Sequence, residues 1–357
     1  MGRRLNVAII GQGRSGRDIH GRFFRSEANV HFDVKYVVEW DAERRERAEK
    51  EYPGCVALKE YTELFDKKDV DLVVNASYSD LHYAITKDLL EHKFNVLTEK
   101  PFGATQYECE VQINAAKKNG VVLAVFQNSQ RAPYYLHALK VMKEGVLGDV
   151  KQVSIRFNGF ARRWDWQTLQ KRVAGSAYNT GPHPIAMALG FLDFDENYRV
   201  AYSKLDRALT SGDAEDYVKI ILTAPGKPVV DIEINSTDAF SDYTLKLQGS
   251  RGTMKSSIGK YEMKYFLTEE NPQREVIETS LKNENGEPMY CGETLKMHEE
   301  SGEYDGNPFT KGTWDIYNNV YDAIVNGAEL LVDPIHSAMT INVIATAHAA
   351  NPLPVKY

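Results

Sequence analysis

A glycine-rich turn near the start of the chain limits the folds that this sequence can adopt. Gly11, Gly13 and Gly16 have the spacing G-x-G-x-x-G and directly follow an apolar run at residues 5–10. A helical stretch that we expect to reach about residue 25 comes next. In this arrangement the first glycine permits a tight turn, the second lets a pyrophosphate approach the backbone, and the third allows close helix–strand packing. The turn therefore predicts a dinucleotide site, with the phosphates at the N-terminus of the helix.

Strand-like and helix-like runs alternate over the first third of the chain. Strands are expected at residues 34–38, 55–57, 70–76, 95–98 and 121–126, with helices at residues 42–51, near 64, 81–91 and 106–118. Alternation of this kind is typical of a doubly wound parallel sheet.

An acidic residue at the end of the second expected strand supports the dinucleotide site. Glu39 lies 23 positions after Gly16, where a carboxylate accepts hydrogen bonds from the adenosine ribose. The same carboxylate would repel a 2′-phosphate, which favours NAD over NADP. Arg44 and Arg45 weaken this preference, although we expect both to be solvated at a helix start.

A lysine at the end of the fifth expected strand is a candidate catalytic group. Lys100 belongs to the tripeptide Glu99-Lys100-Pro101, and Pro101 disfavours a helical backbone at Lys100. The strand therefore ends with this amine at the carboxyl edge of the sheet, where ligands bind in open α/β folds. A lysine before a proline is more often a solvated surface residue, so Lys100 alone is weak support.

The pattern changes after about residue 128. A helix at residues 134–143 ends at Gly145, strands are expected at 151–157, 217–222, 229–235 and 243–248, helices at 314–325 and 336–349, and a polar excursion at 269–306. Clustered strands suggest a mainly antiparallel sheet with helices on one face. We predict an α/β protein with a Rossmann domain at residues 1–128 and an α+β domain with a large open sheet at residues 129–357.

Composition excludes several classes of partner. The formal net charge is −7 and the pI about 5.8, which argues against nucleic acid and anionic membranes as partners. No segment has the roughly 18 apolar residues of a membrane span, and the first residues lack a signal-peptide cleavage site. Three widely separated cysteines fit neither a disulfide framework nor a metal site, so we expect a cytoplasmic protein without a metal.

Three motifs together resemble those of the Gfo/Idh/MocA oxidoreductases, which include glucose–fructose oxidoreductase and inositol dehydrogenase. They are the glycine fingerprint, Glu99-Lys100-Pro101 and Gly181-Pro182-His183, and the resemblance extends over nearly the whole chain. It implies a Rossmann domain that holds NAD or NADP tightly and a second domain whose open sheet often mediates oligomerisation, as a dimer or tetramer. It also implies sugars, polyols or their derivatives as substrates.

The resemblance assigns catalysis to Lys100 and His183. The family's aspartate four positions before the histidine is Asn179 here, and a second aspartate three positions after it is Ala186. An amide cannot take up a proton, so we expect Asn179 to orient the His183 ring. Alone, His183 would as readily be a satisfied loop histidine.

The binding residues that we predict fall into two sets. The cofactor set is Gly11, Gly13, Arg14, Ser15, Gly16, Glu39, Ser77, His82, Glu99, Lys100 and Gln127. The substrate set is Lys100, Arg163, Trp164, Trp166, Tyr178, Asn179 and His183. Arginine and indole groups suit a sugar pocket, but the two tryptophans could equally be buried core anchors.

The function predicted from these residues is transfer of a hydride between NAD and a secondary hydroxyl or ketone of a sugar, polyol or glycoside. A positioned base must accept the hydroxyl proton, because the cofactor takes only the hydride. The absent aspartates leave open a nucleotide-binding regulatory protein without turnover, as in the family's galactose-regulon repressor. Reduction of a non-carbohydrate, as in the similar biliverdin reductases, is a third possibility.

Overall fold

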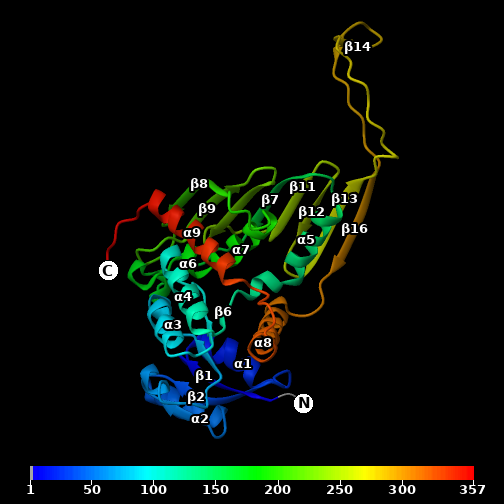
Figure 1. Cartoon of the computed structure of the whole chain (residues 1–357). Coiled ribbons are helices and arrows are strands. Elements are labelled where there is room, and N and C mark those ends of the chain that lie inside the picture. The colour runs from blue at the N-terminus through cyan, green and yellow to red at the C-terminus, as the bar shows by residue number, and fades with distance from the viewer. Residues whose placement is uncertain (1–2) are drawn as a thin grey trace.

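The computed structural model describes residues 3–357, so the first two residues of the predicted N-terminal domain lie outside it. The first sheet is parallel throughout and has the order β3-β2-β1-β4-β5-β6 (Figure 1). Its strands are β1 (Leu5–Ile10), β2 (Phe32–Val38), β3 (Val56–Leu58), β4 (Leu72–Asn75), β5 (Val96–Thr98) and β6 (Leu123–Val125). The order reverses between β1 and β4, which opens a crevice at the carboxyl ends of these strands.

Helices connect the parallel strands. They are a π-helical turn (Arg14–His20) with α1 (Gly21–Phe24), then α2 (Ala42–Glu51), α3 (His82–Glu91) and α4 (Gln106–Asn119), together with short 3₁₀ turns at Tyr61–Leu64, Ser79–Leu81 and Asn128–Arg131. Local sequence signals set their ends. The Asp41 and Thr105 side chains each accept a hydrogen bond at the start of a helix, and Gly120 ends α4 in the left-handed conformation.

The second sheet is mostly antiparallel. Its order is β16-β13-β12-β11-β7-β10-β9-β8, and only the β7–β10 pair is parallel. The strands are β7 (Val150–Arg156), β8 (Arg199–Asp206), β9 (Tyr217–Thr223), β10 (Val229–Asn235), β11 (Leu245–Gly249), β12 (Gly252–Ser256), β13 (Lys260–Phe266) and β16 (Met297–Glu303). Alternating residues of β9 and β10 are buried, as expected for a sheet with one covered face.

Helices cover only one face of this second sheet. They are α5 (Pro133–Glu144), α6 (Ser176–Asn179), α7 (Pro182–Phe191) and α9 (Pro334–Ala350), and none of the helices in residues 3–357 lies on the opposite face (Figure 1). The remaining long helix, α8 (Pro308–Asn326), packs beside the first sheet, where Tyr317 stacks on Phe23 with ring centroids 4.3 Å apart. Within residues 3–357, none of the helices is both long and apolar enough to cross a membrane.

The predicted α/β architecture is confirmed, but several second-domain elements were not predicted. They are helix α7 and strands β8, β12, β13 and β16. The polar excursion at residues 269–306 contains β16, which is the edge strand of the large sheet. Between β13 and β16 the chain projects away from the body as a long hairpin with the short strands β14 (Leu281–Lys282) and β15 (Pro288–Met289) near its tip (Figure 1).

Candidate active site

The glycine turn after β1 leaves an open cradle at one position. Gly11 has φ +90°, and a Cβ there would lie 2.4 Å from the carbonyl oxygen of Ala76. A Cβ on Gly16 would lie 1.8 Å from the carbonyl oxygen of Gly11, whereas one on Gly13 would meet no described atom within 4 Å. The first and third glycines are therefore needed for chain packing. The space beside Gly13 suits a pyrophosphate.

Glu39 ends β2 with a carboxylate that is fixed by backbone amides. The amide of Gln12 donates to Oε2 over 2.8 Å, and the amide of Asp41 donates to Oε1 over 3.1 Å. Arg44 and Arg45 are both partly exposed, as expected at a helix start, and each also contacts Glu39. Arg44 lies 3.7 Å from the Glu39 carboxylate, and Arg45 donates to the Glu39 carbonyl over 2.7 Å.

The residues at the crevice fit a dinucleotide. The open cradle at Gly13 and the carboxylate of Glu39 lie at the ends of the neighbouring strands β1 and β2. Arg14 is exposed and Ser15 is partly exposed at the start of the π-helical turn, so both are accessible beside the cradle. These groups supply the amides, positive charge and ribose acceptor that a dinucleotide requires.

Lys100 lies at the end of β5 with its amine directed at the second domain. Its Nζ donates to the backbone carbonyl of Asn179 over 2.7 Å. Burial lowers the pKa of Lys100, and the positive charges of Arg14 and Arg163 lower it further, although Glu99 opposes them. An amine that is easier to deprotonate than an ordinary lysine can serve as a general base.

Glu99 lies behind the lysine rather than in the open crevice. Its carboxylate is buried and accepts hydrogen bonds from the Lys100 amide over 3.0 Å and from Nε2 of His20 over 3.2 Å. The His20 ring is also 2.7 Å from the hydroxyl of Tyr317. These hydrogen bonds and the nearby positive charges outweigh burial and hold the pKa of Glu99 at about 2. The carboxylate of Glu99 therefore supports the Lys100 backbone and His20 from within the protein, and contact of Glu99 with a cofactor stays a prediction.

His183 is the second residue of α7 and lies near enough to Lys100 to be affected by its charge. Its Nδ1 is 2.9 Å from the hydroxyl of Ser129, so Ser129 holds the ring. Within residues 3–357 no hydrogen bond joins the Asn179 side chain to His183, and Asn179 contributes its backbone carbonyl to Lys100, so orientation of the ring by the Asn179 amide stays a prediction. Burial and the charge of Lys100 lower the pKa of His183 to about 3. His183 is therefore neutral at physiological pH.

Three residues of the predicted cofactor set use their polar groups inside the protein. Ser77 donates through Oγ to Asn75 over 2.7 Å. His82 is buried with its ring nitrogens 2.9 and 3.1 Å from the carbonyls of Pro101 and Ser77, and burial lowers its pKa. The buried Gln127 side-chain carbonyl accepts from Gln130 and Ser337. The ring nitrogens of His82 and the side-chain carbonyl of Gln127 are thus occupied by contacts that hold the loops around the crevice. Nothing supports a direct contact of these atoms with a cofactor.

The loop after β7 contributes unequally to the predicted substrate set. Arg163 is exposed and pairs with Asp165 over 2.7 Å, and Trp164 is 78% exposed, so Trp164 is not a core anchor. Trp166 packs edge-on against Tyr78, with ring centroids 4.9 Å apart. This contact joins the loop to the first domain beside the crevice.

Tyr178 makes its contacts with other parts of the protein. Its hydroxyl donates to the carbonyl of Ala104 over 2.7 Å, and its ring stacks on His348 with centroids 5.0 Å apart. The side chain thus connects α6 to the loop before α4 and to α9, and contact of Tyr178 with a substrate stays a prediction.

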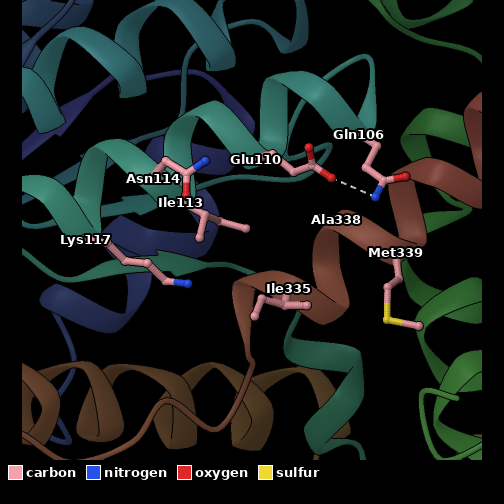
Figure 2. A pocket seen from close by; sticks show the side chains of 8 residues that line it. All are labelled: Gln106, Glu110, Ile113, Asn114, Lys117, Ile335, Ala338 and Met339. Atoms are coloured by element: carbon pink, nitrogen blue, oxygen red, sulfur yellow. Dashed lines mark hydrogen bonds between the residues drawn. The ribbon is translucent and has the colours of Figure 1, made fainter. Parts of the chain in front are cut away.

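A polar cavity of about 220 Å³ adjoins Asn179. Its lining includes Asn158, Arg163, Asn179, Thr180, Thr210, Glu215, Asp216 and Asn235. Amide, hydroxyl and carboxyl groups of this kind suit a ligand with many hydroxyls. A larger hollow of about 320 Å³ lies between α4 and α9, lined by residues such as Ile113, Ile335 and Met339 (Figure 2), and it contains none of the predicted site residues.

Sequence reasoning missed a pair of titratable groups beside the polar cavity, the buried Glu215 and the partly exposed His348. The carboxyl group of Glu215 accepts from the Ala177 amide over 2.9 Å and lies 3.7 Å from Nε2 of His348. Burial raises the pKa of Glu215 to about 7 and lowers that of His348 to about 4. Between these values both groups are neutral, so this short distance is not an ion pair.

The glycine turn lies where the strand order of the parallel sheet reverses, and Lys100 lies at the same edge of the sheet. This combination is typical of nucleotide-binding oxidoreductases. The family model described as "Oxidoreductase family, NAD-binding Rossmann fold" matches residues 5–127, and the "GFO/IDH/MocA C-terminal domain" matches residues 135–255. The chain belongs to the Gfo/Idh/MocA family of oxidoreductases.

Several characterised and uncharacterised proteins are similar to this chain. An uncharacterized oxidoreductase of Schizosaccharomyces pombe is 25% identical, over 79% of this chain and 76% of its own. The scyllo-inositol 2-dehydrogenase (NADP(+)) IolW of Bacillus subtilis is 27% identical over 52% of this chain and 51% of its own. The 2,7-anhydro-N-acetylneuraminate hydratase of Escherichia coli is 22% identical over 76% of this chain and 74% of its own.

Solved structures share the fold over nearly the whole chain. An NAD-binding protein from Listeria innocua has a TM-score of 0.78 and 20% identity, covering 98% of this chain and 97% of that one. GenD2 from gentamicin A biosynthesis, in complex with NAD, has a TM-score of 0.74 and 18% identity, with coverage of 98% and 95%.

Proposed function

We propose that the protein transfers a hydride between NAD and a secondary hydroxyl or ketone of a sugar, polyol or glycoside. The observation that carries this proposal is the position of Lys100. Its amine ends a strand of the nucleotide-binding sheet, has a lowered pKa, and reaches the carbonyl of Asn179, which lines the polar cavity.

Lys100 and His183 have different roles in the proposed proton transfer. The bound nicotinamide supplies or accepts the hydride. Lys100 takes the proton of the substrate hydroxyl, and burial together with neighbouring positive charge makes its neutral form accessible. His183 stays neutral and hydrogen-bonds the same hydroxyl oxygen, while Ser129 holds its ring.

NAD is the cofactor that we propose, with NADP disfavoured. The Glu39 carboxylate is fixed by two amides where the ribose of a bound dinucleotide would lie, and its charge would repel a 2′-phosphate. Arg44 offsets part of that charge. Titration of both cofactors tests the preference, and equal or tighter binding of NADP would contradict it. Glu39→Gln should narrow the difference in affinity between NAD and NADP, because it removes the negative charge while its one side-chain oxygen can still accept from one of the two amides.

A second candidate is a nucleotide-binding regulatory protein that lacks turnover. Asn179 and Ala186 replace the two family aspartates, and Ala186 is fully buried in α7. The relative named as a hydratase also indicates that net oxidation is not the outcome for every similar protein. The free thiols of Cys55, Cys109 and Cys291 support a reducing cytoplasm as the location in either case.

A screen of sugars, inositols and glycosides with NAD, followed by nicotinamide absorbance, separates these candidates. We expect turnover of at least one secondary alcohol and a loss of about 10²–10⁴-fold in Lys100→Ala, the usual range for general acid–base assistance. NAD binding by Lys100→Ala should remain, because the adenosine contacts are unchanged. NAD binding without turnover of any substrate in the panel would favour the regulatory candidate.

A further inference from the structure

Glu215 is a buried acid that the proposed proton transfer does not use. It comes shortly before β9, its side chain is fully buried, and it lines the polar cavity beside Asn179. Oε1 accepts from the Ala177 amide over 2.9 Å, whereas Oε2 has no hydrogen-bond partner among residues 3–357. A buried polar atom without a partner is destabilising unless water or a ligand supplies one. Oε2 is therefore a candidate contact for a ligand in the cavity.

The carboxyl group of Glu215 is held in place for such a contact. Gly175 has φ +97°, and a Cβ there would lie 2.4 Å from Oε1 and 2.7 Å from Oε2. The main-chain carbonyl of Glu215 also accepts from the Ser176 amide over 2.9 Å. Because the glycine leaves this room and two amides fix the residue, the position of Oε2 is set before a ligand binds. Such preorganisation lowers the entropic cost of binding.

A second buried oxygen without a partner lines the same cavity from another element. Asn158, which follows β7, donates through Nδ2 to Glu233 over 2.9 Å and to Asp238 over 3.0 Å. Both hydrogens of the amide are thereby used, and Oδ1 accepts from none of the described residues. The cavity of about 220 Å³ is roughly seven times the ~30 Å³ of one water molecule. It therefore has room for more than a bridging water.

The charged groups around Glu215 leave Oε2 without a cation. On α9, Nε2 of His348 lies 3.7 Å from Oε1, but burial lowers the pKa of His348 to about 4 and keeps the ring neutral near pH 7. The carboxylate of the neighbouring Asp216 accepts from three backbone amides. Arg163 also lines the cavity, and it pairs with Asp165 over 2.7 Å. A neutral ligand group is therefore the simplest partner for Oε2.

A partner of Oε2 must suit both protonation states of the acid. Burial and the negative charge of Asp216 raise the pKa of Glu215 to about 7. Because Oε1 accepts from an amide, the neutral acid carries its proton on Oε2 and donates there, whereas the carboxylate accepts. A carbonyl group can only accept, and an ammonium group can only donate. A hydroxyl group does both, so it satisfies Oε2 on either side of neutral pH.

We propose that Glu215 is a ligand-binding residue whose Oε2 hydrogen-bonds a hydroxyl group of a sugar or polyol, while a different hydroxyl reacts beside Lys100. The reacting end is fixed to the same cavity, because Lys100 donates over 2.7 Å to the carbonyl of Asn179, which also lines it. Glu215 thus selects ligands by a hydroxyl that does not react. The inference rests on the substrate class proposed above, but it concerns binding and does not require turnover.

Binding of two probes, glucose and myo-inositol, tests the role of Glu215. The protein is loaded with NADH, so an alcohol can bind but cannot transfer a hydride. Calorimetry measures the affinity of each probe and of its monodeoxy analogues. At one ring position, loss of the hydroxyl should weaken binding to wild type at least tenfold, equivalent to about 1.4 kcal/mol, because Oε2 loses its partner.

Two leucine variants show whether that loss comes from Glu215. In Glu215→Leu, removal of the same hydroxyl should change the affinity less than about threefold, because the contact is already absent. Glu110→Leu makes the same substitution in the hollow between α4 and α9 and should behave as wild type (Figure 2). NADH affinity is the folding control for both variants.

A crystal structure of wild type with NADH and the tighter-binding probe needs no variant. We expect a ring hydroxyl oxygen about 2.5–3.0 Å from Oε2. Absence of binding by both probes, equal losses for the deoxy analogues in wild type and Glu215→Leu, or a bound probe that leaves Oε2 to water alone would each overturn the proposal. Binding as expected without any turnover would contradict the hydride transfer proposed above and support the role of Glu215.

Discussion

Lys100 and His183, the two predicted catalytic residues, are each held by one hydrogen bond, but the partner atoms differ in kind. Lys100 is held by the main-chain carbonyl of Asn179, whereas His183 is held by the side chain of Ser129. We therefore expect Ser129→Ala to lower kcat about 2–10-fold, as the loss of about 0.5–1.5 kcal/mol from one hydrogen bond implies. Steady-state kinetics on the substrate found by screening measures this change, and NAD affinity should not alter.

Asn179→Leu is the matched comparison for Ser129→Ala. It keeps the carbonyl that accepts from Lys100 but removes an amide from the lining of the polar cavity. We expect a higher KM with a smaller change in kcat than in Ser129→Ala. If Asn179→Leu lowered kcat more than Ser129→Ala, the side chain of Asn179 would have a role in the chemistry.

Glu215 should make stability depend on pH. Its pKa is about 7 in the folded protein, against an ordinary value near 4.5, so the native state binds this proton more tightly. The contribution is fully present below about pH 4.5 and is lost as the pH rises through 7. Between pH 5.5 and 8.5 we expect wild type to lose about 2 kcal/mol more unfolding free energy than Glu215→Gln.

Denaturant titrations of both proteins at the two pH values measure that difference. The glutamine keeps an acceptor for the Ala177 amide and does not titrate, so other groups contribute equally to both proteins. Equal pH dependence in the two proteins would show that the carboxyl group is charged at lower pH than its burial implies. His348 has the opposite effect on stability. Burial lowers its pKa, so its contribution to the free energy of unfolding is present at high pH and is lost as the pH falls.

Residues of the site differ in how far the sequence could predict them. The glycine turn and Lys100 follow strands directly, so spacing alone predicted their position at the sheet edge. Ser129, Glu215 and Tyr317 lie in no local pattern, and they reach the site or its supports only through packing between distant segments.

At the scale of elements, predictability followed the periodicity of burial. The strands β1 and β10 are apolar or alternate regularly, and both were predicted. Helix α7 contains two prolines and a glycine, and every residue except His183 is buried, so no amphipathic stripe marks it. The edge strand β16 is largely exposed along its length and therefore resembles a polar loop.

The glycine turn provides a test at this scale, because two of its glycines serve different purposes. A methyl group on Gly16 would overlap the carbonyl oxygen of Gly11, whereas one on Gly13 would enter open space. We expect Gly16→Ala to destabilise the fold by several kcal/mol, since backbone must move, and Gly13→Ala to leave stability within about 1 kcal/mol. NAD affinity should nevertheless fall in Gly13→Ala, because the pyrophosphate would occupy that space.

Thermal unfolding and NAD titration of the two variants distinguish these roles. Unchanged NAD binding by a folded Gly13→Ala protein would mean that the cofactor does not approach the backbone at this position. A stable Gly16→Ala protein would mean that the turn can shift without loss of the fold.

At the scale of the whole molecule, the chain returns to its first domain after completing the second. Helix α8 comes from the last fifth of the sequence, yet Tyr317 lies in the same apolar cluster as Leu5 and Phe23 of the first domain. Helix α9 then packs between α4 and the helices beneath the large sheet. The two sheets are thus connected by packing as well as by the chain, and we expect them to unfold together.

Tyr317→Phe tests this long-range connection through a single oxygen atom. The Tyr317 hydroxyl is the partner of Nδ1 of the fully buried His20, whose other nitrogen contacts Glu99 beside Lys100. Its removal leaves a buried polar group unpaired, so we expect a loss of about 1–3 kcal/mol in denaturant unfolding, together with slower turnover. Tyr321→Phe is the matched control on the same helix, because its hydroxyl donates to the carbonyl of the exposed Arg3, which water can satisfy instead. Equal effects of the two substitutions on stability and on turnover would mean that α8 supports the first domain only through apolar packing, with no connection from its hydroxyl through His20 to the catalytic edge.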